Sequence, residues 1–417
     1  MPEGRREVRR AHRLAGLARK LGPSIILFLS GAGALFLADL VIARTGRAED
    51  IALWATLKSF MMIGSTFALF GINQLIVREP LAWRMLLRVG VVNILAVSLL
   101  LGVLGDAFDV VANGFVGAIA IAGFSLFNIA FQWLRSNLRV TEAYVVNSSW
   151  RVLFLVGVVI FGILSDLAGI DTILISSFAI GAVVVVGILS RKVPQPELVA
   201  LHDDVRSVKD AYLLGASFFV SALSLAIASY GENLVVQQLG TTADVAQYFR
   251  AAVMFLFPGM MLNQYLTAVL GTVLRQQEQR VLGILRRHCW GGVLGFALLW
   301  PLLVLGGYVL EVLVYGAAET PAVLAALLAL TSCVRLLYVL PGAFVGVIAD
   351  RNALSRASAV YLAGALSLPV FSVVFHAVGL AIVTSVALAS LINWILRSLV
   401  GVRLVAERIA MDRQRGV

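Results

Sequence analysis

The sequence predicts an all-α polytopic membrane protein with twelve transmembrane helices in two six-helix halves. Three observations predict this fold: the composition, the regular succession of apolar runs, and a weak internal repeat. The 417-residue chain is 60% hydrophobic and only 13% charged, which is outside the range of soluble domains. Its apolar runs reach the length of about 20 residues at which a helix crosses about 30 Å of hydrocarbon.

The apolar runs define the individual spans. Each is expected to be helical, because a helix satisfies its own backbone hydrogen bonds in hydrocarbon. The predicted limits are 21–43, 51–76, 86–104, 115–133, 147–165, 172–190, 211–236, 245–274, 289–314, 322–348, 357–376 and 379–401.

The longest polar connection divides these spans into two equal sets. It is the proline-bearing stretch RKVPQPELVALHDDVRSVKD, and it follows the sixth span. The predicted organisation is a basic N-terminal tail, a six-helix half, a linker, a second six-helix half and a basic C-terminal tail, at 1–20, 21–190, 191–210, 211–401 and 402–417.

An internal repeat relates the two halves. ADLVIARTGRAEDIALWA, from Ala38, aligns without gaps on ENLVVQQLGTTADVAQYF, from Glu232, at an offset of 194 positions. Six spans return the chain to the side on which it began, so both halves run in the same direction. We therefore expect a pseudo-two-fold axis along the membrane normal and a cavity between the halves.

The basic residues indicate the orientation in the membrane. Of the 33 Lys and Arg, 7 lie in the N-terminal tail and 20 in the C-terminal tail and the loops after even-numbered spans, whereas the opposite side has only Arg44 and Arg47. The positive-inside rule therefore predicts that both termini face the cytoplasm. The net charge of +10 is explained by this asymmetry, and we expect no nucleic-acid partner.

Four cations remain within the spans: Lys58, Arg151, Arg250 and Arg335. Arg151 is predicted to reach the nearby cytoplasmic surface. Lys58 and Arg250 are predicted about 10 Å and about 8 Å from the outer surface, and Arg335 about 18 Å from it. An arginine at that depth costs about 3 kcal/mol if it faces lipid, so it should face a partner or a wet cavity. Converging cations predict an anionic ligand.

Two acids, Asp39 and Glu232, accompany these cations at nearly repeat-equivalent positions. In one interpretation Asp39 with Lys58 and Glu232 with Arg250 are structural ion pairs. In the other, the cations bind ligand phosphate and the acids couple transport to a proton or sodium ion. Lys58 could also extend outward along its aliphatic stem.

Other features of the chain carry less information about function. Asn73, Asn263 and Gln264 are candidates to line the lumen, with hydrogen bonding between helices as the alternative. The sequence has no nucleotide-binding GxxxxGK[ST] stretch, no Ser/His/Asp arrangement and no metal-ligand cluster. We therefore expect a carrier without cofactor or metal, and not an enzyme.

Two stretches resemble a known family. RTGRAEDIALWATLKSFMMIGSTFALFGINQLIVRE and LGTTADVAQYFRAAVMFLFPGMML are similar to the first hairpins of the two halves in polysaccharide-export flippases. These belong to the superfamily that also contains multidrug and toxin extruders. Trp54 and Tyr248 match the family's aromatic position, whereas Ala52 and Ala246 replace its usual glycine.

The resemblance implies a flippase that moves an undecaprenyl diphosphate-linked oligosaccharide from the cytoplasmic to the periplasmic leaflet by alternating access, for polysaccharide or O-antigen biosynthesis. It implies that Lys58, Arg250 and Arg335 bind the diphosphate. It also implies membrane lipids, a polymerase and glycosyltransferases as partners, and a monomer is expected. Two alternatives stay open: a cation-coupled multidrug antiporter of the same fold, which would use Asp39 and Glu232, and a membrane scaffold without transport activity.

Overall fold

The computed structural model describes residues 26–137, 139–164, 169–191, 207–263, 266, 289–347 and 351–414, and these residues form helices and short connections. The first span is Ile26–Thr45. The other elements of the N-terminal half are α2 (Ala48–Leu69), α3 (Ile72–Arg78), the short 3₁₀ helix η1 (Pro80–Ala82), α4 (Trp83–Ala107), α5 (Gly114–Ser136), α6 (Val140–Leu164) and α7 (Ile170–Leu189). The C-terminal half contains α8 (Val208–Leu239), α9 (Thr242–Phe255), α11 (Cys289–Tyr315), α12 (Ala322–Val347), α13 (Arg351–Ala377) and α14 (Ile382–Gln414).

The number of spans agrees with the prediction. In the described part of the chain, eleven helices are long and apolar enough to cross a membrane, and a bent pair, Thr242–Phe255 with Phe257–Asn263, makes up to twelve. The pair is bent by 51° next to Pro258, which has no backbone N–H to donate to the preceding turn. The remainder of the predicted span 245–274 lies largely outside the described residues, as do the N-terminal tail and most of the linker. α14 continues to Gln414, so that most of the predicted C-terminal tail is helical.

The second predicted span is also broken. α2 ends at Leu69, the next two residues, Phe70 and Gly71, have φ angles of 44° and 75°, and the chain then resumes as α3. At this break the backbone meets α8 so closely that a Cβ on Gly71 would lie 2.4 Å from the carbonyl oxygen of Gly215. Glycine is needed here for both reasons, since it adopts positive φ freely and leaves room for the opposing backbone.

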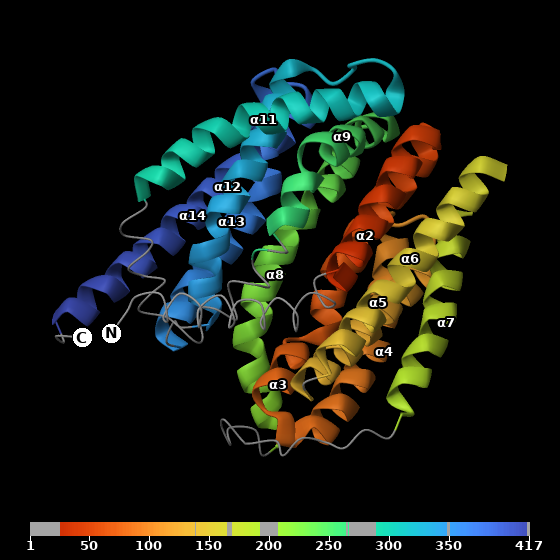
Figure 1. Cartoon of the computed structure of the whole chain (residues 1–417), viewed down its shortest axis with the longest axis vertical. Helices are drawn as coiled ribbons and strands as arrows, with labels where there is room; N and C mark the ends of the chain where they lie inside the picture. The colour runs from red at the N-terminus through yellow and green to blue at the C-terminus, as the bar shows by residue number, and fades with distance from the viewer. Residues whose placement is uncertain are drawn as a thin grey trace, which may run out of the picture.

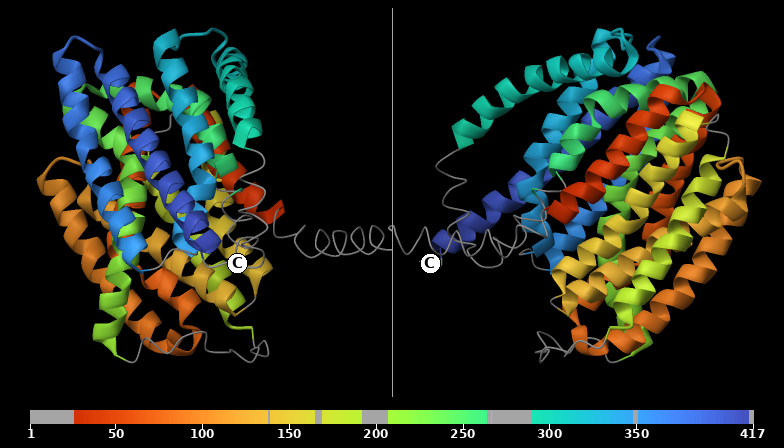
Figure 2. Two further views of the ribbon diagram at one scale, coloured as in Figure 1. Left: turned by 90° about the vertical axis from the view of Figure 1, so that its left-hand side faces the viewer. Right: turned by 45° about the vertical axis from the view of Figure 1, so that its right-hand side comes forward.

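α8 lies where the two halves meet. Figure 1 shows α2 and the other N-terminal helices, coloured red to yellow-green, on one side of α8, and α11 to α14, in cyan and blue, on the other. α8 packs extensively against α13 and α2, and α2 also packs against α9. The views of Figure 2 show the same division into two bundles. The boundary between the halves is therefore formed mainly by α2, α8 and α9.

The internal repeat is visible in how the helices begin. In α2 the carboxylate of Asp50 accepts from the backbone N–H of Arg47 at 3.2 Å, and in α9 Asp244 accepts from that of Thr241 at 2.8 Å. Asp244 lies 194 positions after Asp50, so both copies use the same acid to cap the same helix. The repeated sequence therefore includes the residue that caps one helix in each half.

Candidate functional site between the two halves

The acid of the first span is held by two side chains from α2. Lys58 Nζ lies 2.5 Å from Asp39 Oδ2, and Trp54 Nε1 donates to Asp39 Oδ1 at 2.8 Å. Asp39 and Lys58 are only 2% and 6% exposed. The predicted Asp39–Lys58 pair is therefore present, and both carboxylate oxygens are occupied.

Lys58 also contacts the C-terminal half. Its ammonium lies 4.5 Å from the centroid of the Phe257 ring and 5.9 Å from that of Phe249. Aromatic faces attract a cation through their quadrupole and stabilise it where water is scarce. Lys58 does not extend outward in this structure, since it is buried between the two halves.

These residues border a cavity of about 260 Å³ at the boundary of the halves. Its described lining is largely apolar, and the ionisable or hydroxyl-bearing members are Asp39, Lys58, Arg151 and Tyr230. Tyr230 comes from α8 and the other three from the N-terminal half, so both halves contribute polar groups. Tyr230 lies close enough to Asp39, Arg151 and Arg335 to interact electrostatically with each.

Arg151 lines this cavity, contrary to the prediction. The prediction that it reaches the cytoplasmic surface is wrong, because α6 begins at Val140, eleven residues earlier, and the side chain lines the cavity. Its Nε atom is buried without a hydrogen-bond partner among the residues that the structure describes. Sequence reasoning missed it because the polar side chains at the start of α6 were assigned to a loop.

The acid of the C-terminal half has a different set of partners. Arg335 of α12 donates to Glu232 Oε1 at 2.7 Å, Tyr248 of α9 donates to Oε2 at 2.7 Å, and Ser390 of α14 also donates to Oε1. The predicted Glu232–Arg250 pair is thus replaced by Glu232–Arg335. Glu232, Arg335 and Ser390 are each no more than 3% exposed, which makes this network a closed one.

Arg335 faces a partner and not the cavity. Its guanidinium lies 4.6 Å from the Trp394 ring centroid and donates to the carbonyl of Ala228 at 3.3 Å. Among the described residues it does not line the 260 Å³ cavity. The expectation that an arginine at this depth needs a partner or a wet cavity is met by the first option.

Arg250 joins the two halves. Its Nε donates to the carbonyl of Ala43 at 3.2 Å, and its Nη2 to that of Gly46 at 3.5 Å. A cation at these carbonyls complements the negative end of the first span's dipole. Lys58, Arg250 and Arg335 are therefore not brought together around one cavity, and only Lys58 lines it.

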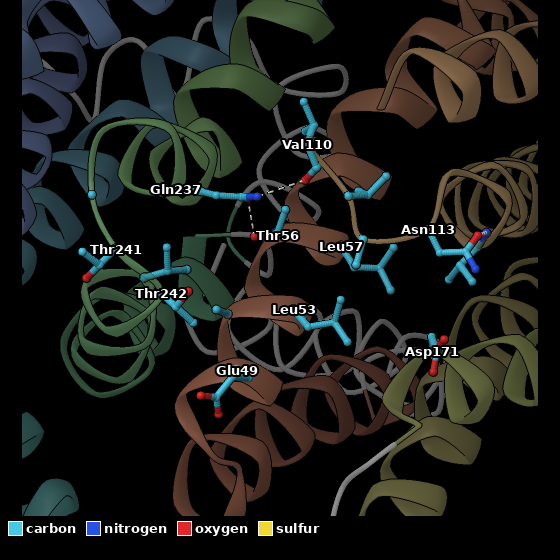
Figure 3. Close-up of a pocket in the computed structure, with 16 residues that line it drawn as sticks. Glu49, Leu53, Thr56, Leu57, Val110, Asn113, Asp171, Gln237, Thr241 and Thr242 are labelled. Atoms are coloured by element: carbon cyan, nitrogen blue, oxygen red, sulfur yellow. Dashed lines mark hydrogen bonds between the residues drawn. The ribbon is translucent and has the colours of Figure 1, made fainter. Parts of the chain in front are cut away.

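A second contact matches this one by symmetry. Thr56 of α2 donates to Gln237 Oε1 of α8 at 2.6 Å, and Gln237 donates to the carbonyl of Val110 at 3.3 Å, as Figure 3 shows. Arg250 lies 194 positions after Thr56, and Gln237 lies 194 positions after Ala43. The same two positions of the repeat thus join the halves twice, once in each direction, and we call these contacts the paired clasp.

A larger cavity of about 570 Å³ lies beside the Thr56–Gln237 contact (Figure 3). Its described lining includes the carboxylates of Glu49 and Asp171 and no cation. Thr56 and Lys58 are two residues apart on α2, and at 3.6 residues per turn they point in nearly opposite directions. The two cavities therefore lie on opposite faces of α2 and differ in charge.

The candidate lumen amides follow the alternative interpretation where they can be placed. Asn263 donates to the carbonyl of Arg335 at 2.6 Å, which is a hydrogen bond between helices. Asn73 lies on α3 and lines neither of the two cavities described. Gln264 lies outside the described residues.

One further buried cation was missed. Arg397 of α14 is 1% exposed, and it donates to the carbonyls of Ser224 and Tyr361 at 2.5 and 3.1 Å. Its guanidinium lies 4.9 Å from the Tyr361 ring centroid. The prediction grouped it with the cytoplasmic tail, although its position four residues before the predicted end of the last span was a signal that it belongs to the interior.

No protein-family model and no curated protein matches the chain. Solved structures do match. An inward-facing multidrug resistance MATE family transporter of the MOP superfamily has a TM-score of 0.59 at 18% identity, over 94% of this chain and 100% of that one. The MATE multidrug transporter DinF-BH in complex with R6G has a TM-score of 0.59 at 17% identity, over 93% and 95%.

An outward-facing MATE transporter of the same superfamily has a TM-score of 0.54 at 15% identity, over 94% of this chain and 96% of that one. The likeness covers nearly the whole of each chain and includes both halves. The protein therefore has the twelve-helix, two-half fold of MATE transporters of the MOP superfamily.

Proposed function

We propose that the protein is an alternating-access transporter that moves a lipid-linked oligosaccharide, recognised by its negatively charged diphosphate, from the cytoplasmic to the periplasmic leaflet. The observation that carries this proposal is the net positive charge of the cavity between the halves. Among the described residues, two cations, Lys58 and Arg151, line it together with one carboxylate, Asp39.

The charge at the cavity supports an anion in particular. Two cations and one carboxylate line it among the described residues, and the carboxylate already has two hydrogen-bond donors. Since Asp39 is already paired with Lys58, a cationic ligand would meet a net positive charge in an apolar setting, which disfavours it. A diphosphate would meet two donors that bind phosphate oxygens well.

Alternating access requires the boundary of the halves to open. The paired clasp is built from a few hydrogen bonds, each worth about 1 kcal/mol net, and so can break without unfolding either half. We propose that the protein lies in a bacterial inner membrane with its termini in the cytoplasm. The distribution of basic residues then places the clasp at the periplasmic side. We further propose that the protein is a monomer and works together with a polymerase and glycosyltransferases.

A second candidate is a cation-coupled multidrug antiporter. The structural neighbours favour it, since they are multidrug transporters and one is in complex with R6G. The two buried acids, one in each half, also suit it. In this alternative Asp39 and Glu232 would bind the coupling ion or drug, and the cations would only hold them in place.

Transport in proteoliposomes separates the candidates. The test substrates are a fluorescent undecaprenyl diphosphate oligosaccharide and a cationic dye, and the variants are Lys58→Ala and Asp39→Asn, with size-exclusion profiles as the check on folding. The flippase proposal predicts that the lipid is moved and that Lys58→Ala abolishes movement. Dye export that is lost in Asp39→Asn and kept in Lys58→Ala would replace it with the antiporter.

A further inference from the structure

Arg151 has no counter-charge among the residues that the structure describes. It lines the 260 Å³ cavity, and its Nε atom is buried and lacks a hydrogen-bond partner in the described part of the chain. The structure gives it no ion pair there, whereas Lys58 in the same cavity is paired with Asp39. A guanidinium away from water is costly unless an anion or several acceptors satisfy it.

The cavity itself offers no suitable anion. Asp39 is its one carboxylate among the described lining residues. Asp39 Oδ1 accepts from Trp54 and Oδ2 from Lys58. Tyr230, which interacts electrostatically with Arg151 across the boundary of the halves, is a phenol and brings no full charge. Among the described residues no group is left to neutralise Arg151, which favours an anion that enters the cavity from outside.

The chemistry around Arg151 favours a phosphate-type anion. A guanidinium presents a planar fork of donors that matches two oxygens of one phosphate group. Lys58 supplies a second cation on the same cavity wall, and the Tyr230 hydroxyl can donate from the opposite half. The remaining lining, such as Met62, Phe124 and Met260, is apolar and would strengthen these interactions by keeping water away.

We infer that Arg151 is the principal contact for a phosphate or diphosphate group in the cavity between the halves, with Lys58 as the second cation. This inference rests on the proposed function for the identity of the carrier lipid, but the anion site itself does not depend on transport. Because Arg151 and Tyr230 come from different halves, a bound anion would link the two bundles.

The test is calorimetric binding to the purified full-length protein in an uncharged detergent. The probes are inorganic pyrophosphate, a polyprenyl diphosphate and phosphatidylglycerol, which separate a free phosphate, a substrate-like headgroup and an ordinary phospholipid. The variants are Arg151→Gln and, as a matched control, Arg135→Gln on an exposed part of α5. We expect the diphosphates to bind about 10- to 100-fold more weakly to Arg151→Gln, as loss of a charged hydrogen-bond donor implies, and unchanged to Arg135→Gln.

Each outcome has a definite meaning. Diphosphate binding that is equal in wild type and Arg151→Gln, or absent from the wild type, would overturn the inference even if lipid-linked oligosaccharide is transported. Binding that depends on Arg151 without such transport would support the site and refute the proposed function. Phosphatidylglycerol binding with the same dependence would support the site but reassign it to a phospholipid headgroup.

A second variant covers poor folding of Arg151→Gln. Arg151→Lys keeps the charge and loses the planar fork, so its diphosphate affinity should lie between those of the wild type and Arg151→Gln. If Arg151→Gln does not fold, the affinity of Arg151→Lys should still be lower than that of the wild type. Affinity equal to that of the wild type would show that the guanidinium is not the recognition element.

Discussion

The two buried acids, Asp39 and Glu232, occupy nearly matching places in the two halves but are held in different ways. Each accepts a hydrogen bond from the aromatic residue at the same position of the repeat, Trp54 in one half and Tyr248 in the other. The cation of Asp39 comes from the next helix and borders a cavity. The cation of Glu232 comes from α12, 103 positions later, and is enclosed.

This difference separates a closed network from an open one. We call Glu232, Arg335, Tyr248 and Ser390 the closed network, because three helices supply its donors and the described cavities do not reach it. Asp39, Trp54 and Lys58 form the open network, since Asp39 and Lys58 line the cavity between the halves. The closed network suits a structural role, whereas the open one can respond to a ligand.

The largest expected effect is that of Arg335→Ala. Removing Arg335 leaves the buried Glu232 without its cation, which typically costs about 3–5 kcal/mol of folding free energy. Thermal unfolding of the purified protein in detergent measures it, with Arg403→Ala as the control because Arg403 pairs with Glu407 on the exposed surface. If both variants unfold at the same temperature, the closed network does not stabilise the protein.

A smaller effect is expected for Lys58→Ala. Asp39 loses its cation but borders a cavity, so water can enter and the carboxyl can bind a proton, and we expect a cost of about 1–3 kcal/mol. The same unfolding assay measures this cost. The control is the double variant Asp39→Asn with Lys58→Met, which removes both charges and so leaves no unpaired carboxylate. A loss as large as that of Arg335→Ala would mean that the two networks are equally closed.

Tyr248→Phe should cost less again. It removes one hydrogen bond to Glu232 while Arg335 and Ser390 remain, so about 1–1.5 kcal/mol is expected. Tyr144→Phe is the control, since no hydrogen bond of its hydroxyl is present among the described residues and its ring packs against Phe28 and Phe131. Equal unfolding temperatures for the two variants would show that the Tyr248 bond contributes nothing.

The smallest effect on stability is expected for Arg250→Gln. The side chain loses its charge at the end of the first span, an interaction worth about 0.3–1 kcal/mol. Its consequence should be conformational, because one arm of the paired clasp is weakened. Cysteines placed at Ala52 and Val245, which line the 570 Å³ cavity beside the clasp from α2 and α9, should react faster with a water-soluble thiol reagent in this variant. Unchanged reaction rates would show that Arg250 does not help to close this side.

The sequence predicted the span number, the two halves, the acids and the pair Asp39–Lys58, because hydropathy and a one-hairpin separation are local signals. It could not predict the partner of Glu232, since α12 approaches α8 only through tertiary packing. Arg151 was misplaced because seven residues at the start of α6, which are more polar than the rest, fell outside the predicted span. Arg250 was misread as a partner of Glu232 because its carbonyl acceptors in the other half have no sequence signature.

The sign of the transported charge tests the central claim most directly. Proteoliposomes that contain the wild-type protein would be given the undecaprenyl diphosphate oligosaccharide and a cationic dye in parallel, with empty liposomes as the blank. The two cations that line the cavity between the halves, Lys58 and Arg151, predict that the anionic lipid changes leaflet and that the dye does not cross. Dye transport without movement of the lipid would contradict the claim and identify a multidrug transporter in function as well as in fold.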